Sequence, residues 1–161
     1  MQTQEEQKIL FQELSARLLY STKVQYTDSE EPVTVLTDIG GNMNSDTLSV
    51  GTGYDLRPIN WKSDNRESLP LPVLREVTDI KHHEKEELKK RIAATNVDWK
   101  DSFMLVIDNV NGITIDNLVK GQVIPLIVSN AIIQFCYEKH LDCNMLLPRG
   151  LAVKATEGTY V

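Results

Sequence analysis

A repeat of leucines near the start of the chain predicts a first helix over residues 3–20. A leucine recurs at every fourth position: Leu10, Leu14 and Leu18. That spacing places the three side chains on one face of a helix. Thr3 and Glu6 have the T-x-x-E spacing of a capping box, which satisfies backbone N–H groups at a helix start. Glu13 and Arg17 lie beside the stripe as an i, i+4 pair of opposite charge. We expect the apolar face to pack on the rest of the domain, and the alternative is an exposed helix that binds a partner.

Between residues 23 and 80 the pattern changes to short runs of β-branched and other apolar residues. The runs centre on residues 24–26, 33–36, 48–50, 54–59 and 73–77. Segments rich in Gly, Pro, Asp and Asn separate them, as expected for turns. Short strands at this spacing are typical of a small curved antiparallel sheet or partial barrel. The polar stretch 61–69 predicts an exposed loop.

A second helix and a hairpin follow. An apolar stripe with Glu–Lys and Glu–Arg pairs at i, i+4 predicts a helix over 79–95, capped by Asp79. Apolar runs at 103–110 and 113–119 then flank the dipeptide Asn111-Gly112. Asn-Gly between such runs is the strongest short signal for a β-hairpin with a two-residue type I′ turn.

The last helix is predicted over residues 129–139, with Ser129 as its N-cap. Residues 122–128 lead into it, either extended or as an earlier helical turn that begins at Pro125. We therefore predict an α+β fold: an N-terminal helix, a small curved antiparallel sheet or partial barrel, then helix–β-hairpin–helix. We expect one compact domain, 1–161, with a weak division into a β-rich front, 1–80, and a back of helices and hairpin, 81–161.

Composition and charge narrow the classes of function. With 161 residues, 41% hydrophobic and 25% charged, the chain resembles an ordinary globular domain rather than a disordered one. The formal net charge of -6 repels phosphate groups, so we expect no generic binding to nucleic acid or to an anionic membrane. No apolar run approaches the about 20 residues of a membrane helix, and the N-terminus lacks the features of a signal peptide. We expect a cytoplasmic protein with reduced thiols.

One set of side chains has the residue types of a metal site. Cys136, His140 and Cys143 form a C-x3-H-x2-C pattern, and zinc prefers such thiolate and imidazole ligands. A fourth ligand would be needed, and His82 and His83 are the other histidines. The alternative is that Cys136 belongs to the apolar stripe of the last helix, because a buried thiol behaves as a small hydrophobe. We favour this alternative and predict no bound cofactor.

Two carboxylates flank the predicted hairpin turn. Asp108 and Asp116 could transfer protons or bind Mg²⁺ as a pair. With a two-residue loop, however, Asp108 would pair with Ile115 and Asp116 with Ile107, which directs the carboxylates to opposite faces. The chain also has no G-x-S-x-G motif and no phosphate-binding glycine motif. We therefore predict no catalytic residue and favour a non-enzymatic protein.

The β-rich front resembles Sm-like RNA-binding barrels at the level of the fold. A helix precedes the short strands, and Leu36, Asp38, Asn42 and Leu48 lie among them. The second signature of that family is absent. This analogy gives one alternative function, a nucleic-acid-associated small-barrel module.

Three blocks of the chain, 14–25, 71–80 and 138–160, resemble a family of proteins from mobile elements and phages of gut bacteria. In that family the blocks resemble A-R-L-P-Y-G-V-K-V, P-Y-L-R-P-L-S-S-M-T-E-E-E and H-F-D-Y-R-G-L-I-x-x-G-L-A. The chain keeps the following residues of these patterns: Ala16, Arg17, Leu18, Tyr20, Lys23, Val24, Leu74, Arg75, His140, Asp142, Gly150, Leu151 and Ala152.

The chain also departs from the family's patterns. Leu19 and Ser21 stand where the family has Pro and Gly, Glu76 where it has Pro, and Cys143 where it has Tyr. Lys81 replaces the Thr that caps the family's acidic helix, so we expect the cap to move to Asp79.

The resemblance implies an origin in a phage or mobile element and implies no catalytic residue, because none is assigned to the family. Our first hypothesis is a non-enzymatic accessory or protein-interaction protein in the bacterial host cell. Its partner would be a protein, and neither a membrane nor a nucleic acid. The alternatives are a metal-binding or enzymatic domain that uses Cys136, His140 and Cys143, and the small-barrel module above.

Overall fold

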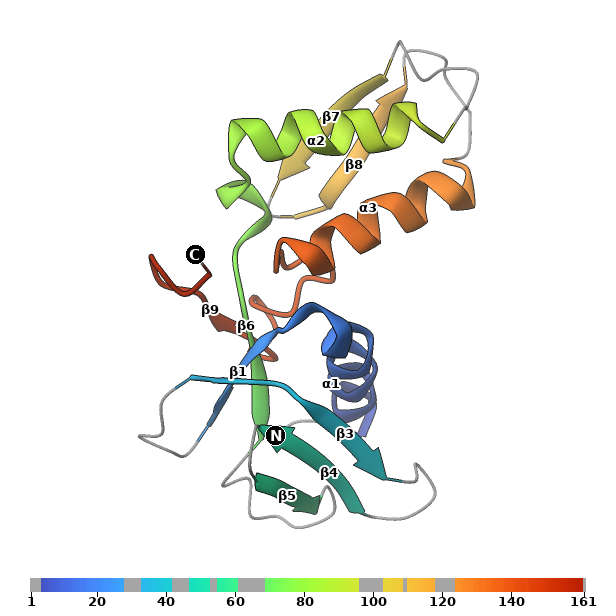
Figure 1. Cartoon of the computed structure of the whole chain (residues 1–161). Coiled ribbons are helices and arrows are strands. Elements are labelled where there is room, and N and C mark those ends of the chain that lie inside the picture. Colours follow the sequence, from blue (N-terminus) through green and yellow to red (C-terminus); the bar gives the residue numbers. More distant parts are fainter. Residues whose placement is uncertain are drawn as a thin grey trace. The chain divides into compact units, whose positions relative to one another are not determined.

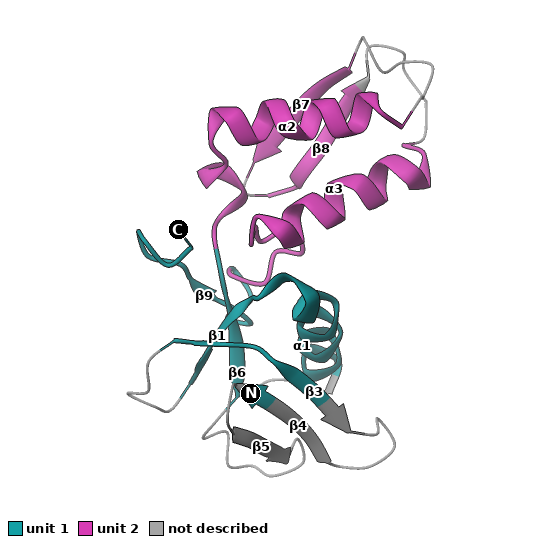
Figure 2. Cartoon of the chain, in the orientation of Figure 1, with its two compact units in different colours: residues 1–74, 148–161 teal, residues 75–147 magenta. Residues whose placement is uncertain are grey.

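The structure is a computed structural model that describes residues 4–27, 33–41, 47–52, 55–60, 69–95, 103–108, 110–117 and 124–160. The chain divides into two compact units. Unit 1 comprises residues 1–74 and 148–161, and unit 2 comprises residues 75–147 (Figure 2). The fold is α+β, as predicted. The sequence predicted a weak division near residue 80; the structure divides the chain at residues 74 and 75 and returns the C-terminal segment to unit 1.

Unit 1 contains the N-terminal helix and two small sheets (Figure 1). Its helices are α1 (Gln4–Arg17) and the 3₁₀ helix η1 (Leu18–Tyr20). Its strands are β1 (Lys23–Tyr26), β2 (Thr34–Val35), β3 (Asp38–Gly41), β4 (Thr47–Thr52), β5 (Asp55–Asn60), β6 (Pro70–Leu74) and β9 (Val153–Lys154). The sheet orders are β2-β1-β6-β9 and β3-β4-β5. Among the described strands, β6 and β9 pair in parallel and the other pairs are antiparallel.

The two sheets of unit 1 are joined where the chain turns between β2 and β3. The Leu36 N–H donates to the Thr22 carbonyl at 2.9 Å, which extends the pairing of β2 with β1. The next residue, Thr37, donates to the Gly51 carbonyl at 2.9 Å, which extends the pairing of β3 with β4. One bent segment therefore belongs to both sheets. The strand spacing predicted one small curved antiparallel sheet or partial barrel, whereas the strands form two small sheets and β6 pairs with β9 in parallel. Gly51 suits the bend, because a Cβ there would lie 2.9 Å from the Cβ of Asp38.

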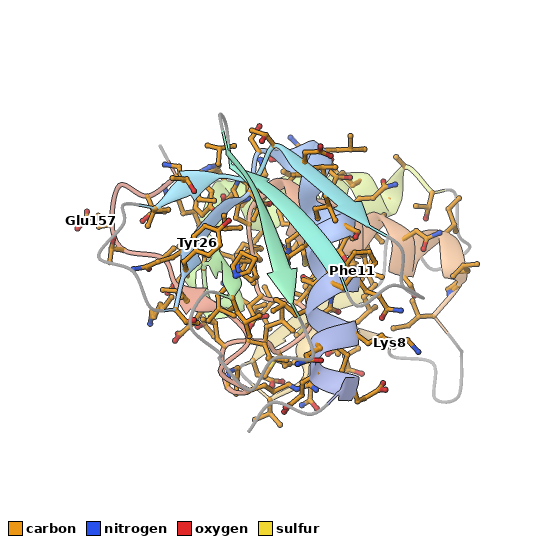
Figure 3. The ribbon with its side chains drawn as sticks, turned by 90° about the horizontal axis from the view of Figure 1, so that it is seen from below. Lys8, Phe11, Tyr26 and Glu157 are labelled. Carbon is orange, nitrogen blue, oxygen red and sulfur yellow. The ribbon has the colours of Figure 1, made fainter. Side chains whose placement is uncertain are left out.

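The core of unit 1 lies between α1 and the first sheet. Its buried residues are Leu10, Leu14, Val24, Leu36 and Leu71. Phe11 packs against this cluster and Tyr26 is 4% exposed; both are labelled in Figure 3. The leucine repeat therefore packs inward, as expected. The proposed Thr3 cap lies outside the described residues.

Unit 2 has the predicted order of helix, hairpin and helix. Its elements are the 3₁₀ helix η2 (Val77–Asp79), α2 (His82–Ala93), β7 (Phe103–Asp108), β8 (Gly112–Asn117) and α3 (Leu126–Glu138). The buried core is formed by α2, α3, η2 and the residues directly after η2 and after α3. Its members are Val77, Ile80, Leu88, Ile92, Val128, Ile132, Phe135, Cys136 and Leu141. Alternate residues of the hairpin pack against it, namely Phe103, Leu105, Ile107, Ile113 and Ile115.

Helix α2 begins later than predicted, and Asp79 is not its cap. Asp79 belongs to η2, and Lys81 is the N-cap residue of α2. The Glu84 carboxylate accepts the Lys81 backbone N–H at 2.8 Å, which is half of a capping box. The lysine ammonium cannot accept a hydrogen bond, so the other half is missing. The cap therefore stays at the position of the family's Thr rather than moving to Asp79.

The hairpin turn also differs from the prediction. Asp108 pairs with Gly112, which leaves a three-residue loop, 109–111, whose first residue lies outside the described residues. Gly112 has φ +72°, as in a three-residue hairpin loop that ends in a bulge. The Asp108 carboxylate favours this loop, because it accepts the backbone N–H groups of Val110 at 2.7 Å and Asn111 at 2.6 Å. These bonds lower the pKa of Asp108.

The start of the last helix settles the alternative that the sequence left open. Helix α3 begins at Leu126, with Pro125 as the N-cap residue. The Ser129 N–H donates to the Pro125 carbonyl at 3.1 Å, so Ser129 is inside the helix and is not its cap. Proline suits this position because it has no backbone N–H that would need a hydrogen-bond partner at the start of the helix.

Candidate functional site

Arg75 joins the start of α2 to the end of α3 within unit 2. Its backbone forms a parallel bridge with Leu141: the Arg75 N–H donates to His140 O at 2.8 Å, and Arg75 O accepts the Asp142 N–H at 2.9 Å. Its guanidinium donates to both carboxylate oxygens of Glu84, each at 2.9 Å. We call Arg75, Glu84, His140 and Asp142 the arginine cluster.

The guanidinium makes two further bonds, to backbone carbonyls. It donates to Asp79 O at 2.7 Å and to Lys139 O at 3.3 Å. Asp79 ends η2 and Lys139 follows α3. The planar fork of an arginine can serve several acceptors at once, which the point charge of a lysine cannot. Arg75 therefore orders both ends of the unit.

The charges of the arginine cluster favour a structural role over proton transfer. Burial opposes the ionisation of Glu84, but the hydrogen bonds from Arg75 and from the Lys81 N–H hold its pKa below the usual value. The bond to Glu84 raises the pKa of Arg75, against the opposing effect of burial. A carboxylate with a lowered pKa beside an arginine stays ionised near neutral pH, so it is a poor general acid or base there.

Asp142 closes the turn that follows α3. It is 3% exposed. One carboxylate oxygen accepts the Leu146 N–H at 2.8 Å and the other accepts the Leu147 N–H at 2.8 Å. Two residues of this turn, His140 and Met145, have left-handed φ values of 55° and 57°. The aspartate therefore holds a backbone path that is unfavourable for residues other than glycine.

A second group of motif residues meets in unit 1, around the hydroxyl of Tyr160. Strands β1 and β6 pair Val24 with Pro72, so Lys23 and Val73 come next along the ladder. The Tyr160 hydroxyl accepts the Lys23 N–H at 3.0 Å and donates to Val73 O at 2.7 Å. A side-chain hydroxyl thus bridges the two strands where a direct backbone bond would be expected.

The lysine and the C-terminal segment reinforce this bridge. Lys23 Nζ donates to Thr159 O and lies 5.6 Å from the centre of the Tyr160 ring. Burial of the hydroxyl raises the pKa of Tyr160 to about 12, despite the opposing effects of the Lys23 N–H and the Arg17 charge. We call Lys23, Val73, Thr159 and Tyr160 the tyrosine clasp. The exposed Glu157 lies at the turn of the same segment and extends away from the ribbon (Figure 3).

The three candidate metal ligands occupy different positions in and around the core of unit 2. Cys136 is in the core of unit 2, Cys143 packs against the edge of that core, and His140 follows the end of α3. His82 and His83 are exposed at the start of α2. Among the described residues, no group of three or more His, Cys, Asp or Glu side chains could hold a metal ion.

The carboxylates of the hairpin lie on the same face, which corrects the prediction of opposite faces. Asp116 pairs with Met104, and Asp108 with Gly112. Positions 104, 106 and 108 share one side of β7 because side chains alternate along a strand. Positions 104 and 108 are four steps apart along the strand, which corresponds to about 13 Å. Asp108 and Asp116 are therefore too far apart to share a proton or a metal ion.

The outer face of α3 was not recognised from the sequence. Leu126 is 75% exposed, Ile127 56% and Ile133 39%. Asn130 and Gln134 are exposed between them. The opposite face of the helix is buried in the core of unit 2. The signal in the sequence was present but weak, because the polar residues Asn130 and Gln134 lie on the same face as the exposed aliphatic residues.

Two interhelical ion pairs hold α3 against α2. Arg91 on α2 contacts Glu138 at 2.6 Å, and Lys139 contacts Glu87 at 2.8 Å. Arg91 and Lys139 also lie over the ring of Phe135, at 5.3 and 5.7 Å from its centre. The charges at the C-terminal end of α3 are therefore already engaged within unit 2.

No family model, no curated protein and no solved structure matches the chain. Within the described residues, no helix has both the length and the apolar character that crossing a membrane requires.

Proposed function

We propose that the protein is a non-enzymatic accessory protein of a phage or mobile element, which acts in the bacterial cytoplasm by binding another protein chain. The observation that carries this proposal is the exposed face of α3, where the aliphatic residues Leu126, Ile127 and Ile133 lie beside the polar residues Asn130 and Gln134. We call these five residues the α3 face.

The energetics of burial support an interaction role for the α3 face. Large aliphatic side chains that remain in water forgo about 1.5 to 3 kcal/mol each relative to full burial. Single exposed hydrophobes are common on protein surfaces, but a contiguous group more often marks a binding surface. Here three aliphatic residues lie within eight positions of one rigid helix. The buried side of α3 fixes their direction.

The phage or mobile-element origin is supported by the resemblance of the three sequence blocks. It is also supported by backbone conformation. The family patterns place glycine at Ser21 and at Met145, and these two residues have φ values of 52° and 57°. Glycine adopts such values without steric cost. The patterns therefore have glycine where this chain has a left-handed backbone.

Affinity capture with matched variants tests the proposed function. The wild-type chain, the double variant Leu126→Lys/Ile127→Lys and the control Val110→Lys are each immobilised and exposed to a lysate of the bacterial host. Val110 is an exposed apolar residue of the hairpin loop, 79% exposed, so the control makes the same chemical change elsewhere in unit 2. We expect a protein that binds the wild type and the control but not the double variant. Equal capture by all three would contradict a role for the α3 face.

A further inference from the structure

The hairpin loop of unit 2 carries the one Asn-Gly dipeptide of the chain, Asn111-Gly112. This dipeptide is reactive in water, because glycine has no side chain to hinder the attack of its backbone nitrogen on the preceding amide. We propose that Asn111 is a site of spontaneous deamidation, and that the Asp108 carboxylate suppresses the reaction as long as unit 2 is folded. The modification then marks chains in which the hairpin has opened.

The reaction needs water and no other reactant. The backbone nitrogen of Gly112 forms a bond to Cγ of Asn111, and the bond from Cγ to Nδ2 breaks. The proton of the Gly112 N–H and the amide NH₂ group leave together as ammonia, so that a cyclic imide remains. Water then opens the ring at either of its carbonyls. One opening gives an aspartyl residue at position 111, and the other gives an isoaspartyl residue, in which the backbone runs through the side chain.

Exposure and sequence favour Asn111 over other asparagines of the described chain. Asn111 is exposed, so water can reach the ring. Asn130 is exposed as well, but it lies inside α3 and precedes an alanine. Asn144 is also exposed, but it precedes Met145, whose side chain hinders the attack. The site is therefore defined by the glycine that follows it.

Asp108 holds the Asn111 side chain in an arrangement that opposes the attack. One carboxylate oxygen accepts the Asn111 backbone N–H at 2.6 Å, and the other accepts Nδ2 of the same residue at 3.2 Å. The carboxylate thus holds the amide on the side of the residue's own backbone nitrogen. The attacking nitrogen belongs to Gly112, which follows Asn111. Rotation of the amide toward that nitrogen therefore breaks a bond to Asp108.

The charge of Asp108 opposes the reaction as well. Asp108 pairs with Gly112 across the hairpin, and a negative charge there disfavours the amide anion that attacks. The hydrogen bonds from Asn111 and Val110 lower the pKa of Asp108. Asp108 therefore stays ionised near neutral pH and cannot give a proton to the leaving amide. Gly112 is also buried, which limits the movement of its nitrogen.

Conversion of Asn111 reverses the contacts that form the loop. A carboxylate oxygen replaces the Nδ2 donor and repels Asp108. An isoaspartyl residue also adds a carbon atom to the backbone beside Gly112, which has φ 72°. A Cβ on Gly112 would lie 3.5 Å from the Cys143 carbonyl oxygen, so the loop lies against the turn that follows α3. The modification therefore weakens the hairpin, and refolding does not reverse it.

Mass spectrometry of the purified full chain tests this inference. The protein is held at pH 8 and 37 °C, with and without guanidinium chloride at a concentration that unfolds it. Conversion adds about 1 Da to the hairpin peptide, fragmentation places the change at position 111, and an isoaspartyl methyltransferase labels the isoaspartyl product. We expect the folded wild type to convert roughly tenfold or more slowly than the unfolded one, because attack requires local opening. Asn111→Gln should gain no mass at this position over the same time.

Variants of Asp108 test whether this side chain provides the protection. Folded Asp108→Ala is expected to convert about fivefold or more faster than the folded wild type, but at the wild-type rate in guanidinium chloride, where salt screens the charge. Asp108→Asn keeps the shape without the charge and should also convert faster; it serves if the alanine variant does not fold. Asp116→Ala is the matched control, because it removes a carboxylate from the same face of the hairpin. Circular dichroism establishes that each variant is folded.

Each outcome decides one part of the proposal. No conversion in the unfolded wild type overturns the modification site. Equal rates in the folded and unfolded wild type overturn protection by the fold. Folded Asp108 variants that convert as slowly as the folded wild type overturn the role of Asp108. An equal acceleration in Asp116→Ala also overturns that role, because it assigns the effect to the charge of the hairpin as a whole.

Discussion

Replacing Tyr160 with phenylalanine removes a single oxygen atom that bridges β1 and β6. The hydroxyl accepts one hydrogen bond from the Lys23 N–H and donates one to Val73 O. Without it, two backbone groups of neighbouring strands lose their bridge while the ring stays in place. Each lost hydrogen bond is worth about 1 kcal/mol, so we expect Tyr160→Phe to lower the free energy of unfolding by about 2 kcal/mol at pH 7.

The effect of this substitution should depend on pH in a defined direction. The pKa of Tyr160 rises to about 12 in the folded protein, whereas the unfolded value is about 10. The folded state therefore holds this proton more tightly, and its contribution is complete below pH 10 and lost as the pH rises through 12. A shift of two units corresponds to about 2.7 kcal/mol. The stability difference between wild type and Tyr160→Phe should thus shrink to about zero near pH 12.

Two measurements check this reasoning. Urea unfolding of the wild type, Tyr160→Phe and the control Tyr20→Phe between pH 7 and 12 gives the stability differences. The control reports the loss of a tyrosine hydroxyl elsewhere in unit 1. Hydrogen exchange gives a local readout, because the Lys23 amide should exchange faster in Tyr160→Phe alone. An unchanged stability together with unchanged protection of Lys23 would refute the role of the tyrosine clasp.

Three further substitutions test the local geometry through thermal and urea unfolding. Ser21→Gly should stabilise unit 1 by about 0.5 to 1 kcal/mol, because Ser21 is exposed and has φ 52°; no gain would contradict the left-handed conformation. Lys81→Thr should stabilise α2 by about 1 kcal/mol by completing the capping box with Glu84, and Lys81→Ala, which cannot cap, is the control. Arg75→Lys should destabilise unit 2 by about 2 kcal/mol, because a lysine keeps the charge but loses the fork that holds Glu84; a variant as stable as the wild type would exclude that role.

The elements of the fold with local periodicity could be predicted from the sequence. The leucine repeat gave α1 and its buried side. The apolar runs gave β1, β2, β4, β5 and part of β6, but they missed β3 and β9. The hairpin was predicted correctly, but the length of its loop was not. Asn111-Gly112 allows two turn types, and the choice came from the Asp108 carboxylate, which binds the loop amides. Such side-chain competition has no periodic signal.

The two clusters could not be predicted because they join residues that are distant in the sequence. Tyr160 lies 137 residues from Lys23 and 87 from Val73, and Arg75 lies 64 residues from Lys139. Nothing near any of these residues indicates its partner. The family patterns marked several of them without giving a reason. The structure supplies one, since these residues close the two units.

The position of the tyrosine clasp affects the order in which the protein can fold during synthesis. The second segment of unit 1, residues 148–161, follows residue 147, so the ribosome completes unit 2 first. At about 5 to 20 residues per second, the 73 residues of unit 2 (147 − 75 + 1) delay the clasp by roughly 4 to 15 s. Throughout this interval, the nascent β6 lacks both β9 and the tyrosine that ties it to β1. A ribosome that stops before codon 160 therefore releases a chain that contains both β1 and β6 but lacks the tyrosine that bridges them.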